Sequence, residues 1–157
     1  MTSMKIAIRK AGVDDLEHVL HHRLAMFEDM GHLDPEILER VAKHSEKYFR
    51  EALKNGTYVA WLAVESKSGK VVAGSGLLIA AWPGHPGENR PERAWILNVY
   101  TEPEARRKGV AKQLMEVIIA WCRERGLHTV SLHASPAGKS LYESLGFQAT
   151  NEMRLKL

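Results

Sequence analysis

The chain has 157 residues, 45% of them hydrophobic, which suits a single domain covering residues 1–157 with a substantial core. Its formal net charge of +3 arises from charges of both signs scattered along the chain, which argues against the clustered basic face of a nucleic-acid-binding protein. No apolar run approaches the roughly 20 residues that span a bilayer, and residues 1–5 lack the apolar core of a signal peptide. We therefore expect a soluble, cytoplasmic protein that binds neither nucleic acid nor membranes.

The first half of the chain predicts a strand, two helices and a β-hairpin. Side chains near the start alternate between apolar and polar, as in a strand, and apolar residues then recur with helical spacing. Asp34 and Pro35 supply an N-cap and a first-turn proline for the second helix. The expected elements are a strand at 4–9, helices at 14–31 and 35–54, strands at 58–64 and 71–81, and a loop at 82–92.

The second half predicts the order strand, helix, strand, helix, strand. A stripe of apolar side chains from Ala111 to Cys122 marks the longer helix, which Gly126 closes. The other expected elements are strands at 94–100 and 129–133, a short helix at 137–144 and a final strand at 147–157. The chain thus predicts six or seven strands and four helices, in an α/β fold built on a mixed sheet.

The turn between the strand at 94–100 and the longer helix predicts a phosphate-binding site. Its sequence is Arg106-Arg107-Lys108-Gly109-Val110-Ala111. A glycine at such a junction exposes consecutive backbone N–H groups, and the helix that follows adds its positive N-terminal end. The three cations supply further charge, which suits a diphosphate.

Two segments of the second half resemble the GNAT superfamily of acyl-CoA-dependent N-acyltransferases. The first runs from Val99 through the phosphate turn to Ala111, and the second, about thirty residues later, is Leu141-Tyr142-Glu143-Ser144-Leu145-Gly146-Phe147. The resemblance implies a mostly antiparallel sheet with helices on both faces. It also implies an N-acetyltransferase, in which the primary amine of a small molecule or peptide attacks acetyl-CoA directly in a ternary complex and releases coenzyme A.

The resemblance assigns coenzyme A binding to the strand before the turn, to the turn and to the short helix. Arg106, Gly109 and Ala111 match the pyrophosphate loop of the family, in which backbone N–H groups hold the diphosphate. A solvated charged patch is the alternative reading of the basic side chains. The full expected set is Leu97, Asn98, Val99, Thr101, Arg106, Arg107, Lys108, Gly109, Val110, Ala111, Lys112, Ser135, Lys139, Ser140 and Tyr142.

Catalytic roles also follow from the resemblance. Tyr142 is implied as the general acid toward the departing thiolate, and a backbone N–H near Val99 as the donor to the thioester oxygen. Apart from the motif, Tyr142 reads as a core residue whose hydroxyl reaches the surface. The general base stays open because residues 94–100 contain no carboxylate. We assign Glu28, with Asp29, Glu92, His133 and ordered water as the alternatives.

The acceptor side is expected in the first two helices and in the loop before the central strand. An acid there would attract an amine, whereas Arg90 or His85 would hold a carboxylate, so amino acids and polyamines both fit. A second hypothesis is a binding module that retains acyl-CoA without turnover, and the fold is compatible with a homodimer. The residues expected on this side are Met26, Phe27, Glu28, Asp29, Met30, Trp82, His85 and Arg90.

Several other residues predict no chemistry. The histidines His18, His21 and His22 are expected on a solvated helix face rather than around a metal ion, and no metal site is predicted. Cys122 lies on the apolar stripe, which predicts a buried packing role. Trp61 and Trp121 are expected to be structural.

Overall fold

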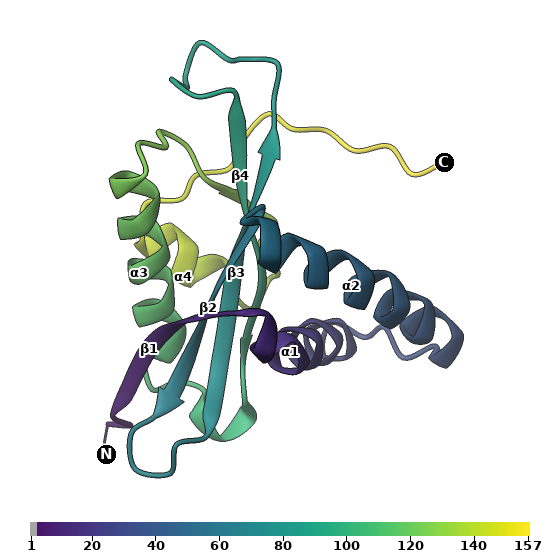
Figure 1. The fold of residues 1–157 in the computed structure, drawn as a ribbon, viewed down its shortest axis with the longest axis vertical. Coiled ribbons are helices and arrows are strands. Elements are labelled where there is room, and N and C mark those ends of the chain that lie inside the picture. The colour runs from purple at the N-terminus through teal and green to yellow at the C-terminus, as the bar shows by residue number, and fades with distance from the viewer. Residues whose placement is uncertain (1–2) are drawn as a thin grey trace.

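The computed structural model describes residues 3–157. These residues form one sheet with helices packed against both of its faces (Figure 1). The strands are β1 (Ile6–Ala11), β2 (Tyr58–Glu65), β3 (Val71–Ala81), β4 (Glu92–Thr101) and β5 (Ser131–Leu132). The helices are α1 (Leu16–Asp29), α2 (Pro35–Asn55), α3 (Val110–Glu124) and α4 (Lys139–Ser144), with short 3-10 turns η1 (Val13–Asp15) and η2 (Pro103–Ala105). The predicted helices and the predicted hairpin are confirmed.

The sheet is mixed and mostly antiparallel, as the family resemblance implies. Its strand order is β1-β2-β3-β4-β5, and each of the first four strands pairs antiparallel with the next. Only the last pair is parallel, because α3 carries the chain back along the sheet between β4 and β5. That pair is short and joins Trp95 to Ser131 and Ile96 to Leu132.

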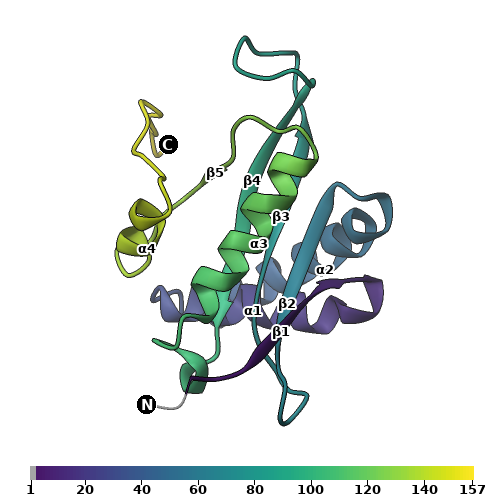
Figure 2. The same ribbon diagram turned by 90° about the vertical axis from the view of Figure 1, so that its left-hand side faces the viewer.

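Each face of the sheet has its own hydrophobic core. On one face α3 buries Leu114, Met115 and Ile118 completely, and α4 lies on the same side (Figure 2). On the other face α1 and α2 pack together, with Phe49 of α2 against Tyr58 of β2. Both faces are therefore covered by helices, as predicted.

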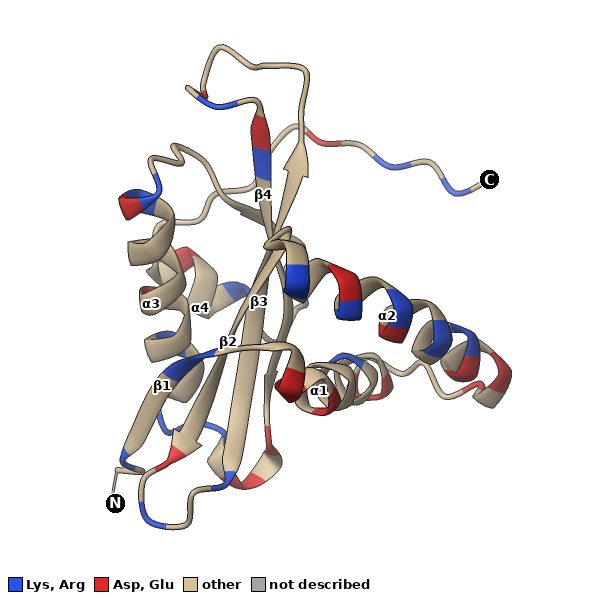
Figure 3. Ribbon diagram, viewed as in Figure 1, with Lys and Arg blue, Asp and Glu red and all other residues tan. Residues whose placement is uncertain are grey.

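Helix α2 shows how local sequence sets an element's ends. The Asp34 side chain accepts a hydrogen bond from the Glu36 amide at 2.9 Å, and Gly56 ends the helix with a left-handed φ of 78°. Charges of both signs alternate along the exposed side of α2 (Figure 3), with ion pairs Lys43–Glu39 and Arg50–Glu46. No helix within residues 3–157 has the length and apolar character needed to cross a membrane.

The packing roles predicted for three residues are confirmed. Cys122 is buried in the core under α3, and burial raises the pKa of its thiol to about 11. The rings of Trp61 and Trp121 meet edge to face, with centroids 5.6 Å apart. All three side chains therefore stabilise the α3 face of the sheet.

The predicted final strand is wrong, and the described residues form five strands rather than six or seven. Residues 147–157 pair with no other strand, and the predicted strand at 129–133 is reduced to β5. The alternating side chains Met153, Leu155 and Leu157 are 94%, 80% and 114% exposed. Alternation shows which residues share a face, but a strand also needs a neighbouring edge, and this segment leads away from the sheet (Figure 1).

The expectation of a solvated histidine face is wrong for His22. His18 and His21 are exposed, but the His22 ring is 2% exposed and lies 5.5 Å from the ring of Tyr100. Its space comes from Gly74 of β3, where an added Cβ would lie 2.5 Å from His22 Nδ1. The absence of a side chain at Gly74 therefore makes room for His22. Helical spacing alone places His22 on the polar side of α1.

Burial, helped by the nearby His21 and His18, lowers the pKa of His22 to about 4. An unfolded histidine titrates near pH 6.5, so between these values only the unfolded chain takes up the proton, and stability falls as the pH falls. We expect the free energy of unfolding of the wild type to drop by about 2 kcal/mol more than that of His22→Gln between pH 7 and pH 5.

Urea unfolding at the two pH values measures this difference. The exposed His44 provides the control, because His44→Gln should keep the wild-type dependence. Equal pH dependence in His22→Gln and the wild type would contradict the burial argument.

Candidate active site

A β-bulge interrupts β4 where the sequence predicts contact with the acyl donor. Gly76 of β3 faces Leu97, but Gly74 already faces Tyr100, so two residues of β4 lie opposite one residue of β3. Asn98 adopts a left-handed φ of 58°, a conformation that asparagine tolerates better than most residues. The strand therefore carries a β-bulge at Asn98 and Val99, within the stretch expected to contact coenzyme A.

Beyond the bulge, one edge of β4 has no strand beside it. Strand β5 pairs only with Trp95 and Ile96, after which the two strands diverge. Over Leu97–Thr101 β4 pairs only with β3 among the described residues. Backbone groups along the β5 side of this stretch are available to an extended ligand arm.

The turn after β4 presents free backbone N–H groups. Gly109, with φ 78°, is the N-cap of α3, and Arg107 has φ 60°. Within the described chain the amides of residues 107–112 donate to no acceptor, and the first helical bond joins the Gln113 amide to the Gly109 carbonyl at 3.2 Å. The Arg106 amide donates to the Pro103 carbonyl at 3.3 Å, so the free run begins one residue later than predicted. Such a run at a helix N-terminus favours phosphate.

The basic side chains of the turn differ in availability. Lys108 Nζ donates to the Glu104 carbonyl at 2.8 Å, and Lys112 lies 3.9 Å from Glu116. Arg107 is exposed and pairs with no described side chain. Of these three side chains, Arg107 is therefore the least engaged and the most available to a phosphate.

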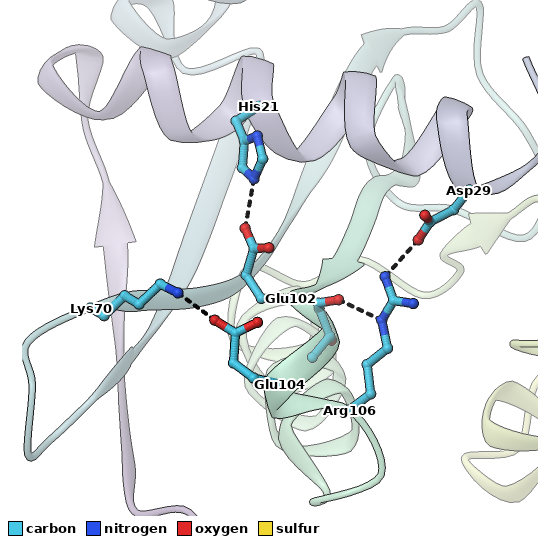
Figure 4. Close-up of polar contacts among 7 residues, drawn as sticks. His21, Asp29, Lys70, Glu102, Glu104 and Arg106 are labelled. Atoms are coloured by element: carbon cyan, nitrogen blue, oxygen red, sulfur yellow. Dashed lines mark hydrogen bonds and ion pairs between the residues drawn. The ribbon is translucent and has the colours of Figure 1, made fainter. Parts of the chain in front are cut away.

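Arg106 points away from the turn and toward α1 (Figure 4). Its Nε donates to the Thr101 carbonyl at 2.9 Å, and its Nη2 lies 2.6 Å from Asp29 Oδ2. A second contact joins α1 to the same segment, with His21 Nε2 2.6 Å from Glu102 Oε1. The Arg106 side chain therefore positions α1 against the end of β4, whereas its backbone belongs to the turn.

Tyr142 is held by its ring and keeps a free hydroxyl. The ring is 8% exposed and meets Phe147 edge to face at 5.9 Å. It packs against Gly138, where an added Cβ would lie 2.9 Å from Tyr142 Cε2. The hydroxyl donates to no described residue and is not among the buried polar atoms without partners, so it reaches solvent. Burial of the ring raises the pKa of Tyr142 above its usual value. The phenol therefore stays protonated at neutral pH, as an acid must.

The remaining predicted residues, Ser135, Lys139 and Ser140, lie shortly before Tyr142 in the chain. Ser135 Oγ accepts a hydrogen bond from the Gly138 amide at 3.3 Å, just before α4. Lys139 and Ser140 are exposed, and Lys139 Nζ is 3.7 Å from Glu143 Oε1. Ser135 therefore shapes the turn that supports Tyr142, while the other two face solvent.

The candidate general bases differ in whether another side chain already pairs with them. Glu92 pairs with Arg90 and Arg125, whose proximity holds the pKa of its carboxyl below the usual range, and it lies seven residues from Val99, roughly 23 Å along a strand. Asp29 is occupied by Arg106. The two less engaged candidates are Glu28, which is exposed on α1, and His133, which is 3.7 Å from Glu152.

The structure also assembles a polar network that sequence reasoning missed. Asn98 Nδ2 donates to the Tyr58 hydroxyl at 2.9 Å, and Asn98 Oδ1 accepts from Arg23 Nη1 at 2.8 Å. Arg23 Nε in turn donates to Ser45 Oγ at 3.0 Å. The signal that pointed here was a polar asparagine in the middle of an otherwise apolar strand.

The chain was compared with known proteins. The sequence pattern of the acetyltransferase (GNAT) family matches residues 19–147. A GCN5-related N-acetyltransferase from Ralstonia eutropha JMP134 is 32% identical, with a TM-score of 0.88 over 98% of this chain and 99% of that one. A predicted acetyltransferase from Clostridium acetobutylicum, crystallised with acetyl-CoA, is 28% identical, with a TM-score of 0.85 over 98% and 96% of the two chains.

A curated relative matches over a shorter length. N-acetyltransferase 8 of Homo sapiens is 27% identical over 78 residues, which are 48% of this chain and 34% of that protein. The family pattern and the fold agree with the bulged strand and the phosphate turn. The chain belongs to the GNAT family of acetyltransferases, which confirms the family resemblance and the expected class of enzyme, an acyltransferase.

The left-handed Gly109 provides a test of the phosphate turn. Alanine at this φ costs about 1 kcal/mol and shifts the free amides, so Gly109→Ala should raise the Kd for coenzyme A by about tenfold. The control is Gly126→Ala, with φ 81° at the other end of α3. Calorimetry should show similar stability losses in both variants but weaker coenzyme A binding only in Gly109→Ala; equal Kd values would exclude the turn as the binding site.

Proposed function

We propose that the protein is an N-acetyltransferase, which transfers the acetyl group of acetyl-CoA to the primary amine of a small molecule or peptide. The observation that carries the proposal is the continuity of three features: a bulged strand, an edge left open by β5, and a run of free amides at the start of α3. An extended ligand arm ending in a diphosphate matches that order. Acetyl-CoA has this form and supplies an activated acetyl thioester.

The donor side uses mainly backbone groups. The amides of residues 107–111 would hold the diphosphate, with Arg107 as the supporting cation. Leu97, Val99 and Thr101 would pair with the pantetheine arm along the open edge of β4. A backbone donor near Val99 would stabilise the negative charge that develops on the thioester oxygen.

The transfer itself needs two proton movements. The neutral amine attacks the carbonyl carbon, a C–N bond forms, and the C–S bond breaks. Tyr142, with its free hydroxyl, gives a proton to the departing thiolate. The proton of the amine leaves through ordered water, Glu28 or His133, since Glu92 and Asp29 are occupied by arginines. No covalent enzyme intermediate is required.

Thiol release from acetyl-CoA tests this proposal against the alternative of a binding module without turnover. Wild-type protein is incubated with acetyl-CoA and, in turn, polyamines, amino acids, aminoglycosides and peptides with free N-termini. Amine-dependent release, with an acetylated product detected by mass spectrometry, supports the enzyme. Tight binding of acetyl-CoA without release for any acceptor supports the module.

The role of Tyr142 gives a sharper prediction. Tyr142→Phe keeps the buried ring but removes the acid, so kcat should fall by about 100-fold or more while the Kd for acetyl-CoA changes little. The matched control is Tyr48→Phe, because Tyr48 is 45% exposed on α2. Unchanged turnover of Tyr142→Phe at saturating substrate would remove the acid role.

A further inference from the structure

Arg23 of α1 is fixed in place by contacts with neutral groups alone. Its Nε donates to Ser45 Oγ at 3.0 Å and its Nη1 to Asn98 Oδ1 at 2.8 Å. Its guanidinium also lies over two aromatic rings, 4.9 Å from the centroid of Phe27 and 5.5 Å from that of Phe49. Residues of α1, α2 and β4 thus hold the side chain in one orientation.

This cation lacks a negative partner in the described chain. No carboxylate of residues 3–157 lies within ion-pair distance of Arg23, whereas Arg9, Arg90, Arg106 and Arg125 each have one. Burial lowers the pKa of Arg23, which reflects the cost of taking its charge out of water. A partly buried, immobilised cation without a counter-ion is unfavourable in the free protein and is typical of a site whose counter-ion arrives with a ligand.

One end of the guanidinium remains free. Nη2 donates to no described residue, and it is not among the buried polar atoms without partners, which are His22 Nε2 and Arg125 Nε. Nη2 therefore reaches solvent. A terminal nitrogen that carries two N–H groups suits a planar carboxylate better than a neutral oxygen.

The position of Arg23 connects it to the reacting centre. Its anchor Asn98 is the residue before Val99, whose backbone is expected to face the thioester. The network lies on the α1 and α2 side of β4, which is the expected acceptor side. A group bound at Nη2 therefore lies on the acceptor side of the bulge, near where the amine must attack.

We infer that Arg23 binds a carboxylate of the acceptor, so that the acceptor is an amino acid or a related amino-carboxylate rather than a polyamine. This inference rests on the proposed acetyltransferase function. The predicted alternatives for carboxylate binding are less suited, since Arg90 pairs with Glu92 at 3.0 Å and His85 Nδ1 accepts from the Gly87 amide at 3.0 Å. The same geometry explains why Asn98 and Ser45 are polar although both are buried.

Matched acceptors test the inference without any variant. Acetyl transfer is measured for phenylalanine, its carboxamide and phenethylamine, for lysine and pentane-1,5-diamine, and for 2-aminoethyl phosphate. We expect kcat/KM for the carboxylates to exceed that of their partners without a carboxylate by about tenfold or more. Equal values within each pair, or a preference for the phosphate, would overturn the inference while leaving acetyl transfer established.

Variants then locate the effect. Arg23→Gln should raise KM for the carboxylates by about 10- to 100-fold, the range for losing a hydrogen bond to a charged group. It should leave KM for the amines without a carboxylate within about twofold. Arg23→Lys keeps the charge and should lose part of the preference even if Arg23→Gln folds poorly. The control is Arg40→Gln, because Arg40 is exposed on α2 and should leave the preference unchanged. A carboxylate preference that is undiminished in both Arg23→Lys and Arg23→Gln would contradict the inference.

Binding separates this inference from the proposed function. Calorimetry with coenzyme A present measures the affinity of the same compounds for wild type and Arg23→Gln. Binding of carboxylates that depends on Arg23, without acetyl transfer, would retain the site and reject the enzyme. Neither transfer nor binding of any carboxylate would reject both.

Discussion

The left-handed backbone of Asn98 is the constraint on which both sides of the site depend. In a regular strand Asn98 would follow Ile96 onto the α3 face, but the extra residue turns its amide toward α1 and α2. There it bridges Arg23 and Tyr58, and the buried Tyr58 hydroxyl would otherwise have no partner. The bulge and the polar network therefore require each other, and together they shape β4 where it separates from β5.

Two glycines of β3 provide the space that this arrangement needs. An added Cβ at Gly76 would lie 2.1 Å from Tyr58 Cζ, and one at Gly74 would lie 2.5 Å from His22 Nδ1. Side chains from α1 and β2 occupy the room that β3 leaves empty. The absence of side chains at these two positions of β3 therefore permits the packing opposite the bulge. Hydrophobic patterning does not show this requirement, because it considers only the side chains that are present.

The parts of the structure that local sequence determines were predictable. The cap at Asp34, the stop at Gly56 and the turn at Gly109 each depend on neighbours along the chain, and each is where the sequence places it. Contacts between distant segments were not predictable. The residues around His22 in the sequence do not indicate that it packs against Gly74. No local pattern indicates that Arg23 binds Asn98, which lies 75 residues further along the chain.

Helix α1 contacts both the segment that leads into the phosphate turn and the bulge of β4. Asp29 holds Arg106 and His21 holds Glu102 (Figure 4). Arg23 of the same helix holds Asn98. A ligand that displaces α1 from either side therefore changes the free energy of binding on the other. Thermodynamic linkage makes that change equal whichever ligand binds first, so in the proposed enzyme a donor and an acceptor that both displace α1 would alter each other's affinity without touching.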